Sequence, residues 1–288
     1  MTTASLMIDV SELEKLKEHI LKTGLKREQP TNEYELLRIK DGDVGIIVYK
    51  SGKVVHNGTN ASLQVLHSIL KKELKHDYVL GSDETGKGEW YGPLVVVATA
   101  LTPDEIVEMR KLGVRDSKTI PKTQLMELAK RIRDMKFLRE SRILPPDTYN
   151  DLYATFRKEG KSLNDMLAWA HAEAIKDLLE KLEHRRIRVV IDKFDVKKTE
   201  SRLRGEMRER KIKDDNIEVI QKSKGENEIP VATASIIAKY IFETKVDELN
   251  RKYGVDLRKT TPEDIDPKIL PRVAKLHFKN VAKSISTS

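Results

Sequence analysis

Eleven consecutive residues decide the fold of this chain: Asp83-Glu84-Thr85-Gly86-Lys87-Gly88-Glu89-Trp90-Tyr91-Gly92-Pro93. Two adjacent acids fall where an apolar strand ends, and two glycines beyond them bracket a lysine. Glycine lets a backbone turn sharply and approach a ligand closely, because no Cβ stands in the way. The spacing excludes a P-loop, and a dinucleotide-binding fingerprint would need glycine where Tyr91 stands. Two interpretations stay open at this point, a surface turn with solvated acids and a ligand-binding turn.

Apolar runs and helical patterns alternate after this stretch, which is typical of α/β architecture around a mixed sheet. The run 93–101 is predicted to be a long buried strand, and the run 187–192 a second one that ends on an acid. A further buried strand is expected over 136–144. Apolar residues at helical spacing predict helices over 103–112, 121–134, 146–158, 162–183 and 230–253.

A smaller unit precedes this alternation and is predicted to contain a helix, three strands and a second helix. The helices are expected over 10–24, after Ser11 as N-cap, and over 61–74. The strands are expected over 34–39, 44–49 and 53–56. One face of so small a sheet must stay open or be covered by a partner. The charged segment 71–77 is expected to link this unit to the rest, and a purely structural appendage is the competing interpretation of the unit.

The bulk composition is that of a charged globular protein, with 39% hydrophobic and 35% charged residues. The absence of cysteine excludes disulfides and thiolate metal sites, so any metal must sit on carboxylates or histidines. The sequence shows neither a long apolar run nor a signal-like start, which favours a cytoplasmic protein without a membrane span. A net charge of +8 favours a polyanionic partner, and residues 1–78 contribute only +1 of it.

Further acids stand where a metal site could be assembled. Asp192 ends its apolar strand, where a β-bonded neighbour could bring it beside Asp83, although strand-end capping is the simpler interpretation. A segment with two more acids runs directly into helix 230–253: Lys222-Ser223-Lys224-Gly225-Glu226-Asn227-Glu228. Clustered carboxylates suit Mg²⁺ or Mn²⁺, which are hard ions that prefer oxygen ligands.

Five segments carry a resemblance to a known family. They are residues 83–93, 115–118 (Arg-Asp-Ser-Lys), 163–171 (Leu-Asn-Asp-Met-Leu-Ala-Trp-Ala-His), 231–239 (Val-Ala-Thr-Ala-Ser-Ile-Ile-Ala-Lys) and 275–280 (Lys-Leu-His-Phe-Lys-Asn). In this order they resemble the type 2 ribonucleases H, and in particular the ribonuclease HIII branch. The N-terminal unit resembles the TATA-binding-protein-like domain that precedes ribonuclease HIII catalytic domains. The resemblance implies a substrate-binding domain over 1–75 and a ribonuclease H-like mixed-sheet catalytic domain over 76–288.

The resemblance implies a metal-dependent hydrolase that cuts the RNA strand of RNA/DNA hybrids and leaves 5′-phosphate and 3′-hydroxyl ends. The catalytic and metal-binding acids of the family fall here on Asp83, Glu84, Asp192 and Glu226. Placement by Pro230 and Val231 selects Glu226, and Glu228 is the competing choice. Two Mg²⁺ or Mn²⁺ ions about 4 Å apart would serve the hydrolysis. The protein is expected to act as a monomer.

The resemblance also indicates substrate-binding residues, namely Gly86, Lys87, Gly88, Ser117, Lys118 and Asn164. The backbone of the glycines would approach 2′-hydroxyls in the RNA minor groove, which distinguish RNA from DNA. Lys118, Lys222 and Lys224 are candidates for phosphate contacts, which add affinity without sequence choice. A core or helix-surface position is the favoured interpretation for His171 and His277.

Other functions fit parts of this pattern. A non-catalytic nucleic-acid-binding protein would account for the charge but leaves the acids without a role. A junction resolvase or integrase of the same broad fold would cut DNA without needing 2′-hydroxyls. The runner-up is incision at single ribonucleotides in duplex DNA, because Lys87 between two glycines is reminiscent of ribonuclease HII enzymes. The N-terminal unit and the C-terminal motif favour extended hybrids instead.

Overall fold

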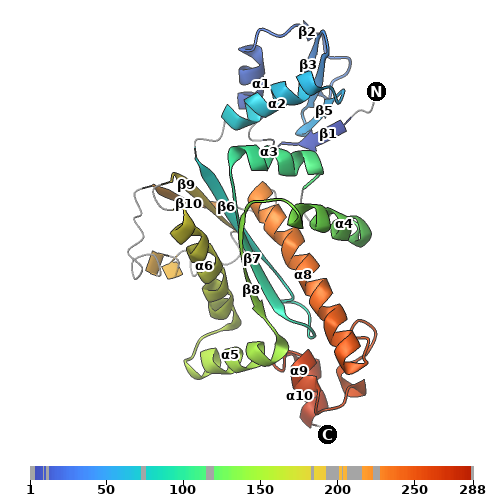
Figure 1. Cartoon of the computed structure of the whole chain (residues 1–288), viewed down its shortest axis with the longest axis vertical. Coiled ribbons are helices and arrows are strands. Elements are labelled where there is room, and N and C mark those ends of the chain that lie inside the picture. The colour runs from blue at the N-terminus through green and yellow to red at the C-terminus, as the bar shows by residue number, and fades with distance from the viewer. Residues whose placement is uncertain are drawn as a thin grey trace.

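The computed structural model describes residues 4–8, 10, 13–72, 76–114, 120–182, 185–192, 201–202, 204–205, 216–222 and 228–286. They form two sheets, one in an N-terminal unit and one in a larger unit that follows it (Figure 1). The two ends of the chain lie at opposite ends of the molecule. Within the described ranges, none of the helices has the length and apolar character that a membrane crossing needs.

The N-terminal unit is an antiparallel five-stranded sheet with the strand order β1-β5-β4-β3-β2. Its strands are β1 (Ala4–Met7), β2 (Arg27–Glu28), β3 (Glu35–Asp41), β4 (Val44–Tyr49) and β5 (Lys53–His56), and its helices are α1 (Leu13–Leu21) and α2 (Asn60–Lys72). The three predicted strands and both helices are confirmed, but the expected number of strands is wrong. β1 and β2 are edge strands of four and two residues, too short to show the alternation from which the others were predicted.

Burial alternates along the strands of this sheet, so that its two faces differ. Ile39, Ile46 and Val54 are buried in one core with residues of both helices. Arg38, Ile47 and Val55 are neighbours across β3, β4 and β5 on the other face, and they stay partly exposed. The open sheet face expected from the sequence is therefore present.

The larger unit is built on a five-stranded sheet with the order β10-β9-β6-β7-β8. Its strands are β6 (Tyr78–Thr85), β7 (Leu94–Leu101), β8 (Leu138–Leu144), β9 (Ile187–Asp192) and β10 (Ile217–Lys222). β10, β9 and β6 are parallel, β7 is antiparallel to β6, and β8 is antiparallel to β7, which is the mixed sheet predicted. β10 was missed because this short run mixes apolar with charged and amide residues. β8 was expected to be buried, but it is an edge strand in which Leu144 alone is buried.

The predicted helices of the larger unit are all present, each within two residues of its expected bounds. They are α3 (Pro103–Leu112), α4 (Lys122–Arg133), α5 (Pro146–Lys158), α6 (Leu163–Lys181) and α8 (Ile229–Tyr253). Capping boxes start α3 at Thr102 and α6 at Ser162, where each hydroxyl accepts from the backbone three residues on. The chain continues through η4 (Pro262–Asp264), α9 (Leu270–Val273) and α10 (Lys279–Ser286), which were not predicted.

Helices cover both faces of the central sheet. Alternate residues of each strand point to opposite sides, and apolar residues on both sides pack against these helices. Val79 and Val97 pack in the core that includes α8, α3 and α4. Leu80, Ala98 and Ala100 pack in a second core with α6. β7 is buried along its whole length, as a strand covered on both faces should be.

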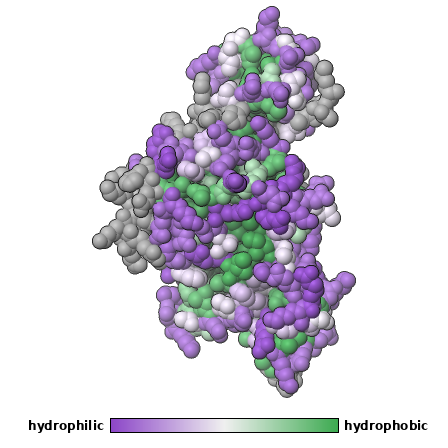
Figure 2. All heavy atoms as spheres, in the orientation of Figure 1, coloured by the Kyte–Doolittle hydropathy of each residue, from purple (hydrophilic) through white to green (hydrophobic). Residues whose placement is uncertain are grey.

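The N-terminal unit rests on α3 (Figure 1). Val107 of this helix is buried in the core of the N-terminal unit, whereas Ile106 and Met109 belong to the core over the central sheet. One helix therefore joins the two cores. Figure 2 shows the molecule in the orientation of Figure 1. The surface seen there is mostly hydrophilic, and hydrophobic side chains form a strip along the middle of the larger unit.

Candidate active site

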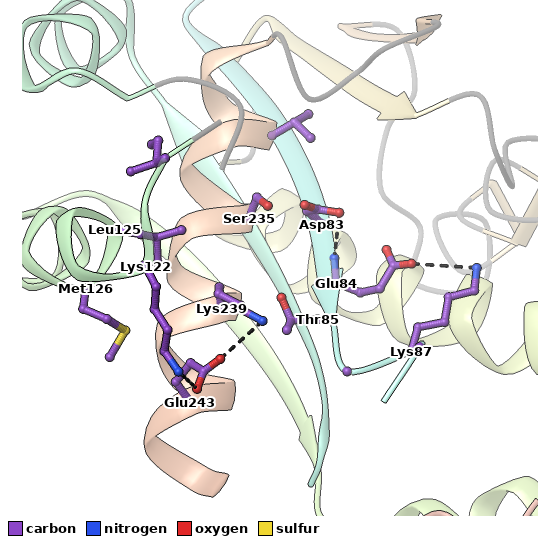
Figure 3. Close-up of a pocket in the computed structure, with 14 residues that line it drawn as sticks. Asp83, Glu84, Thr85, Lys87, Lys122, Leu125, Met126, Ser235, Lys239 and Glu243 are labelled. Atoms are coloured by element: carbon purple, nitrogen blue, oxygen red, sulfur yellow. Dashed lines mark hydrogen bonds and ion pairs between the residues drawn. The ribbon is translucent and has the colours of Figure 1, made fainter. Parts of the chain in front are cut away.

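The adjacent acids Asp83 and Glu84 lie among the last three residues of β6, which continues to Thr85 (Figure 3). Strand alternation directs them to opposite faces of the sheet. Asp83 follows Val79 on the side of α8, and Glu84 follows Leu80 on the side of α6. Each acid is therefore held from a different helical layer.

Asp83 is bonded to α8 and to its own strand. Its side chain hydrogen-bonds with Ser235, and its Oδ1 accepts from the backbone N–H of Glu84 at 2.9 Å. Burial and the neighbouring charge of Glu84 together raise the pKa of Asp83 to about 6, although both hydrogen bonds act in the opposite direction. Ser235 has no counterpart among the predicted site residues.

Glu84 is held by His171 of α6, which a sequence-based interpretation placed in the core or on the helix surface. The His171 Nε2 lies 3.1 Å from Glu84 Oε2 and donates to it, while Nδ1 lies 2.9 Å from the hydroxyl of Ser82. Burial would raise the pKa of Glu84, but the hydrogen bond and charge of His171, with the charge of Lys87, lower it overall. His171 therefore orients a candidate acid, which corrects the earlier interpretation.

The strand β9 brings Asp192 to the same end of the sheet. β6 and β9 are paired in parallel up to Gly81 and Val190, and both Asp83 and Asp192 stand two residues beyond that pair. The register therefore places both positions at the same end of the sheet, on neighbouring strands. The side chain of Asp192 is not among those described. Within the described part of the chain, no three carboxylate or imidazole groups gather at one point.

Several predicted positions lie outside the described residues, namely Ser11, Ser117, Lys118, Lys224 and Glu226. The start of α8, which is described, lies close to the strand that carries the acids. A Cβ added to Gly81 would stand only 2.6 Å from the backbone nitrogen of Val231, so the start of α8 packs directly on β6. Glu228, the competing fourth acid, is the N-cap residue of α8 and makes no side-chain capping bond.

The glycine turn after the acids is fixed by its own hairpin. Gly86 has a φ of +96°, and an added Cβ would stand 2.2 Å from the carbonyl oxygen of Pro93. A side chain is therefore excluded at Gly86 by the fold itself. An added Cβ at Gly88 would meet nothing within 4 Å, so no packing explains the glycine there. Lys87 lies between them, with its Nζ 3.9 Å from Glu84 Oε1.

The C-terminal motif, residues 275–280, contacts this hairpin through Lys275. Lys275 is fully buried, and its Nζ donates to the carbonyl oxygens of Glu89 and Tyr91, both at 2.9 Å. Its backbone N–H donates to the carbonyl oxygen of Trp90 at 2.7 Å. Burial lowers the pKa of Lys275 to about 7. The resemblance included this motif without giving it a role, and the structure shows that it anchors the segment carrying the glycine turn.

A cavity of about 540 Å³ opens beside the acids (Figure 3). Asp83, Glu84 and the turn from Gly86 to Gly88 line it, as predicted for site residues. Its other polar lining was missed and comes from Thr85 of β6 and from four residues of α4 and α8: Lys122, Ser235, Lys239 and Glu243. Three of these stand four residues apart on α8, a spacing that places them on one side of a helix. That spacing is visible in the sequence, but nothing in the sequence tells which side faces the acids.

Two other predicted or discussed residues lie away from this cavity. Asn164 is exposed near the start of α6, seven residues before His171 and so on the same side of the helix, roughly 10 Å along it. His277 packs against the rings of Tyr149 and Tyr153, at ring-centroid distances of 5.6 and 4.6 Å. His277 is thus half-buried in a cluster of aromatic rings, which agrees with a packing role.

Comparison with known proteins identifies the family. Residues 80–281 match the family model described as ribonuclease HII. A ribonuclease HIII from Chlamydia felis is 32% identical over 285 residues, which cover 95% of this chain and 86% of that relative. The chain belongs to the ribonuclease HIII family. The resemblance found in the sequence is thereby confirmed, and this ribonuclease H is an endonuclease and a hydrolase.

Solved structures of ribonuclease HIII proteins share the fold. The crystal structure of Bst-RNase HIII in complex with Mn²⁺ matches with a TM-score of 0.63 at 23% identity and covers 99% of both chains. That of Aquifex aeolicus ribonuclease H3 matches with a TM-score of 0.56 at 25% identity, over 96% of this chain and 100% of the other. The mixed-sheet ribonuclease H fold with a small N-terminal unit is therefore confirmed.

Proposed function

We propose that this ribonuclease H hydrolyses the RNA strand of RNA/DNA hybrids, using Mg²⁺ or Mn²⁺ held by Asp83, Glu84, Asp192 and Glu226. One observation carries the proposal. Two adjacent acids lie near the end of the central strand, each held from a different face of the sheet, at the wall of one cavity. The products would carry 5′-phosphate and 3′-hydroxyl ends, as the family resemblance implies.

The described donors fit a hard divalent cation. Burial and mutual repulsion penalise two neighbouring carboxylates, as the raised pKa of Asp83 indicates, and a bound cation would offset both effects. The register of β9 against β6 supports Asp192 as a further ligand. The close packing of α8 on Gly81 supports a ligand from the segment just before that helix. When bound, a pair of such ions supplies an activated water and stabilises the leaving oxygen.

The residues of the chain itself orient the acids and receive the substrate. Ser235 fixes Asp83, and His171 fixes Glu84 through the bond that Ser82 supports from the other ring nitrogen. Partners of this kind set ligand geometry and are typically worth about 10- to 100-fold in affinity or activity. The open space beside Gly88 would admit the sugar-phosphate backbone of the hybrid, so that main-chain groups reach 2′-hydroxyls.

The division into residues 1–75 and 76–288 places all four acids in the second part. We infer that the N-terminal unit binds the hybrid through its open sheet face, which presents Arg38 and Lys40. A monomeric state and a cytoplasmic location remain predictions of the sequence. Sedimentation at increasing protein concentration would test the monomer.

The decisive test compares substrates of one sequence. A uniform RNA/DNA hybrid, the same duplex as DNA, and a DNA duplex with one ribonucleotide are digested in Mg²⁺, in Mn²⁺ and after chelation. We expect rapid cleavage of the hybrid with either ion, none after chelation, and none of plain DNA. Cleavage of plain DNA would contradict the proposal. Efficient 5′-side incision at the lone ribonucleotide in Mg²⁺ would shift the substrate preference to that of ribonuclease HII.

A further inference from the structure

The cavity beside the acids has a basic end that lies farther along α8. Val231, Ser235, Lys239 and Glu243 follow one another every four residues and all line the cavity (Figure 3). Four residues advance a helix by about 6 Å. Since Ser235 hydrogen-bonds with Asp83, Lys239 stands about 6 Å and Glu243 about 12 Å beyond the acids along the helix axis.

Glu243 gathers three cations at this end. Its carboxylate accepts from Lys122 Nζ at 2.8 Å and from Arg258 Nη2 at 2.5 Å, and it pairs with Lys239 Nζ at 3.3 Å. The Glu243 side chain is only 7% exposed. Burial would raise its pKa, but the bonds from Lys122 and Arg258 and the nearby charges hold it at about 2. The Glu243 carboxylate therefore stays ionised near neutral pH and holds the three cations in place.

The two lysines differ from the arginine in what they face. Lys122 and Lys239 line the cavity, with side chains 58% and 36% exposed, whereas Arg258 does not line it and also pairs with Asp247 at 2.7 Å. An ammonium group has three N–H donors, so a bond to Glu243 leaves donors on each lysine for a second acceptor. Three cations thus converge on two carboxylates, Glu243 and Asp247, and Arg258 alone already pairs with both. The cluster therefore keeps one positive charge that its own carboxylates do not balance, at the wall of the cavity.

We propose that Lys122 and Lys239, held in place by Glu243, form a subsite for a backbone phosphate of the nucleic-acid substrate. The identity of that substrate rests on the proposed function. The offset of about 6–12 Å along α8 places this phosphate within a few nucleotides of the bond at the acids. The cavity would thus separate its charges, with carboxylates for cations at one end and ammonium groups for a phosphate at the other.

The test measures binding without cleavage. The full-length protein is titrated with a hybrid of defined length after chelation, over a series of salt concentrations. Each phosphate contact contributes about 0.9 to the slope of log affinity against log salt concentration. We expect Lys122→Gln and Lys239→Gln each to weaken binding several-fold and to lower this slope by about one. Lys122→Arg and Lys239→Arg should keep the slope, because they keep the charge.

Lys245→Gln is the matched control. Lys245 is on α8 as well, is 42% exposed and pairs with Glu248, but it does not line the cavity. An unchanged slope in both cavity variants would overturn the subsite, and so would an equal drop in the Lys245 variant, which would indicate a general charge effect. Melting temperatures near wild type would confirm that the variants fold.

Trimming the hybrid locates the contact. As nucleotides are removed from one end, the affinity lost through Lys239→Gln should disappear once the contacted phosphate is gone. A loss that persists in every trimmed hybrid would contradict a fixed subsite. Cleavage in Mg²⁺ is measured separately. If the variants have a lowered slope but the wild-type protein does not cleave the hybrid, the subsite stands and the proposed function is wrong. If the wild-type protein cleaves the hybrid and the variants have an unchanged slope, the proposed function stands and the subsite is wrong.

Discussion

The two sheets of this protein bury their residues in different ways. Buried and partly exposed residues alternate along β3 and β4 of the N-terminal sheet. In the central sheet, β7 is buried throughout and β6 is buried from Val79 to Ser82. An alternating sheet leaves one face free for a large ligand. A sheet covered on both faces can meet a ligand only at the ends of its strands, and the acids of β6 stand at such an end.

Charged side chains of the two sheets have different kinds of partners. Arg38 donates hydrogen bonds to Glu35 and holds its pKa at about 2, and Lys40 pairs with Glu28 at 3.5 Å, so neighbouring strand residues satisfy one another. Asp83 and Glu84 instead depend on residues of distant helices. A buried carboxylate is costly unless it is paired and hydrogen-bonded. The comparison therefore supports the proposal that the chemistry takes place at the strand end and that the open face binds the substrate.

The largest expected effect comes from the acids of the covered sheet. Asp83→Asn and Asp192→Asn should each reduce hybrid cleavage by on the order of 10³-fold or more, as for residues that act as one catalytic unit. The amide keeps the shape and removes the charge that would bind a cation, so folding and hybrid binding should persist. Turnover is measured at saturating Mg²⁺. Near-wild-type rates in either variant would remove that residue from the site.

The fourth acid separates two neighbouring positions. Glu226→Gln should reduce cleavage about as strongly as Asp83→Asn, whereas Glu228→Gln, at the N-cap of α8, should have a small effect. Both variants are assayed with the same metal and the same hybrid. If the Glu228 variant alone is severely impaired, the assignment of the fourth acid is shifted by two residues.

His171 should have the next largest effect, because it holds Glu84 without being placed as a ligand itself. His171→Ala should lower activity or metal affinity by roughly 10- to 100-fold, the range typical of residues that orient metal ligands. Activity is measured against metal concentration, so that weaker metal binding shows as a shifted midpoint. His277→Ala is the control, since His277 packs against tyrosine rings away from the cavity. A smaller effect of His171→Ala than of the control would contradict the orienting role.

Local signals explain how much of the fold could be predicted. Thr102 and Gly113 mark the ends of α3, and Ser162 marks the start of α6, so helix bounds follow from capping chemistry. Contacts between residues far apart in the chain have no comparable local signal in the sequence. Ser82 and Glu84 meet His171 across more than 80 positions, and the sequence of α6 alone does not show which side meets β6. Asp83 and Glu84 stand out in the sequence because they are adjacent, whereas the residues that hold them do not.

Deleting residues 1–75 removes the open sheet and leaves the strand end. We expect KM for the hybrid to rise about tenfold, a loss of ~1.4 kcal/mol of binding, with a smaller change in kcat. No predicted acid lies in the deleted part. Val107 of α3 loses its cover in the truncated chain, so a melting curve must show that the remainder is folded. A folded truncation with unchanged KM would show that the open sheet does not bind the hybrid.

The smallest expected effect comes from one charge on the open sheet face. Lys53 of β5 is exposed and alternates with the buried Val54, which places it on the side of the sheet away from the core. Lys53→Glu should raise KM a few-fold and lower the salt dependence of hybrid binding by about one unit of slope, because a single phosphate contact is lost. Lys22→Glu, at an exposed lysine just after α1, makes the same charge change away from that face. Equal effects in the two variants would indicate long-range charge attraction and would deny the open face a specific part in binding.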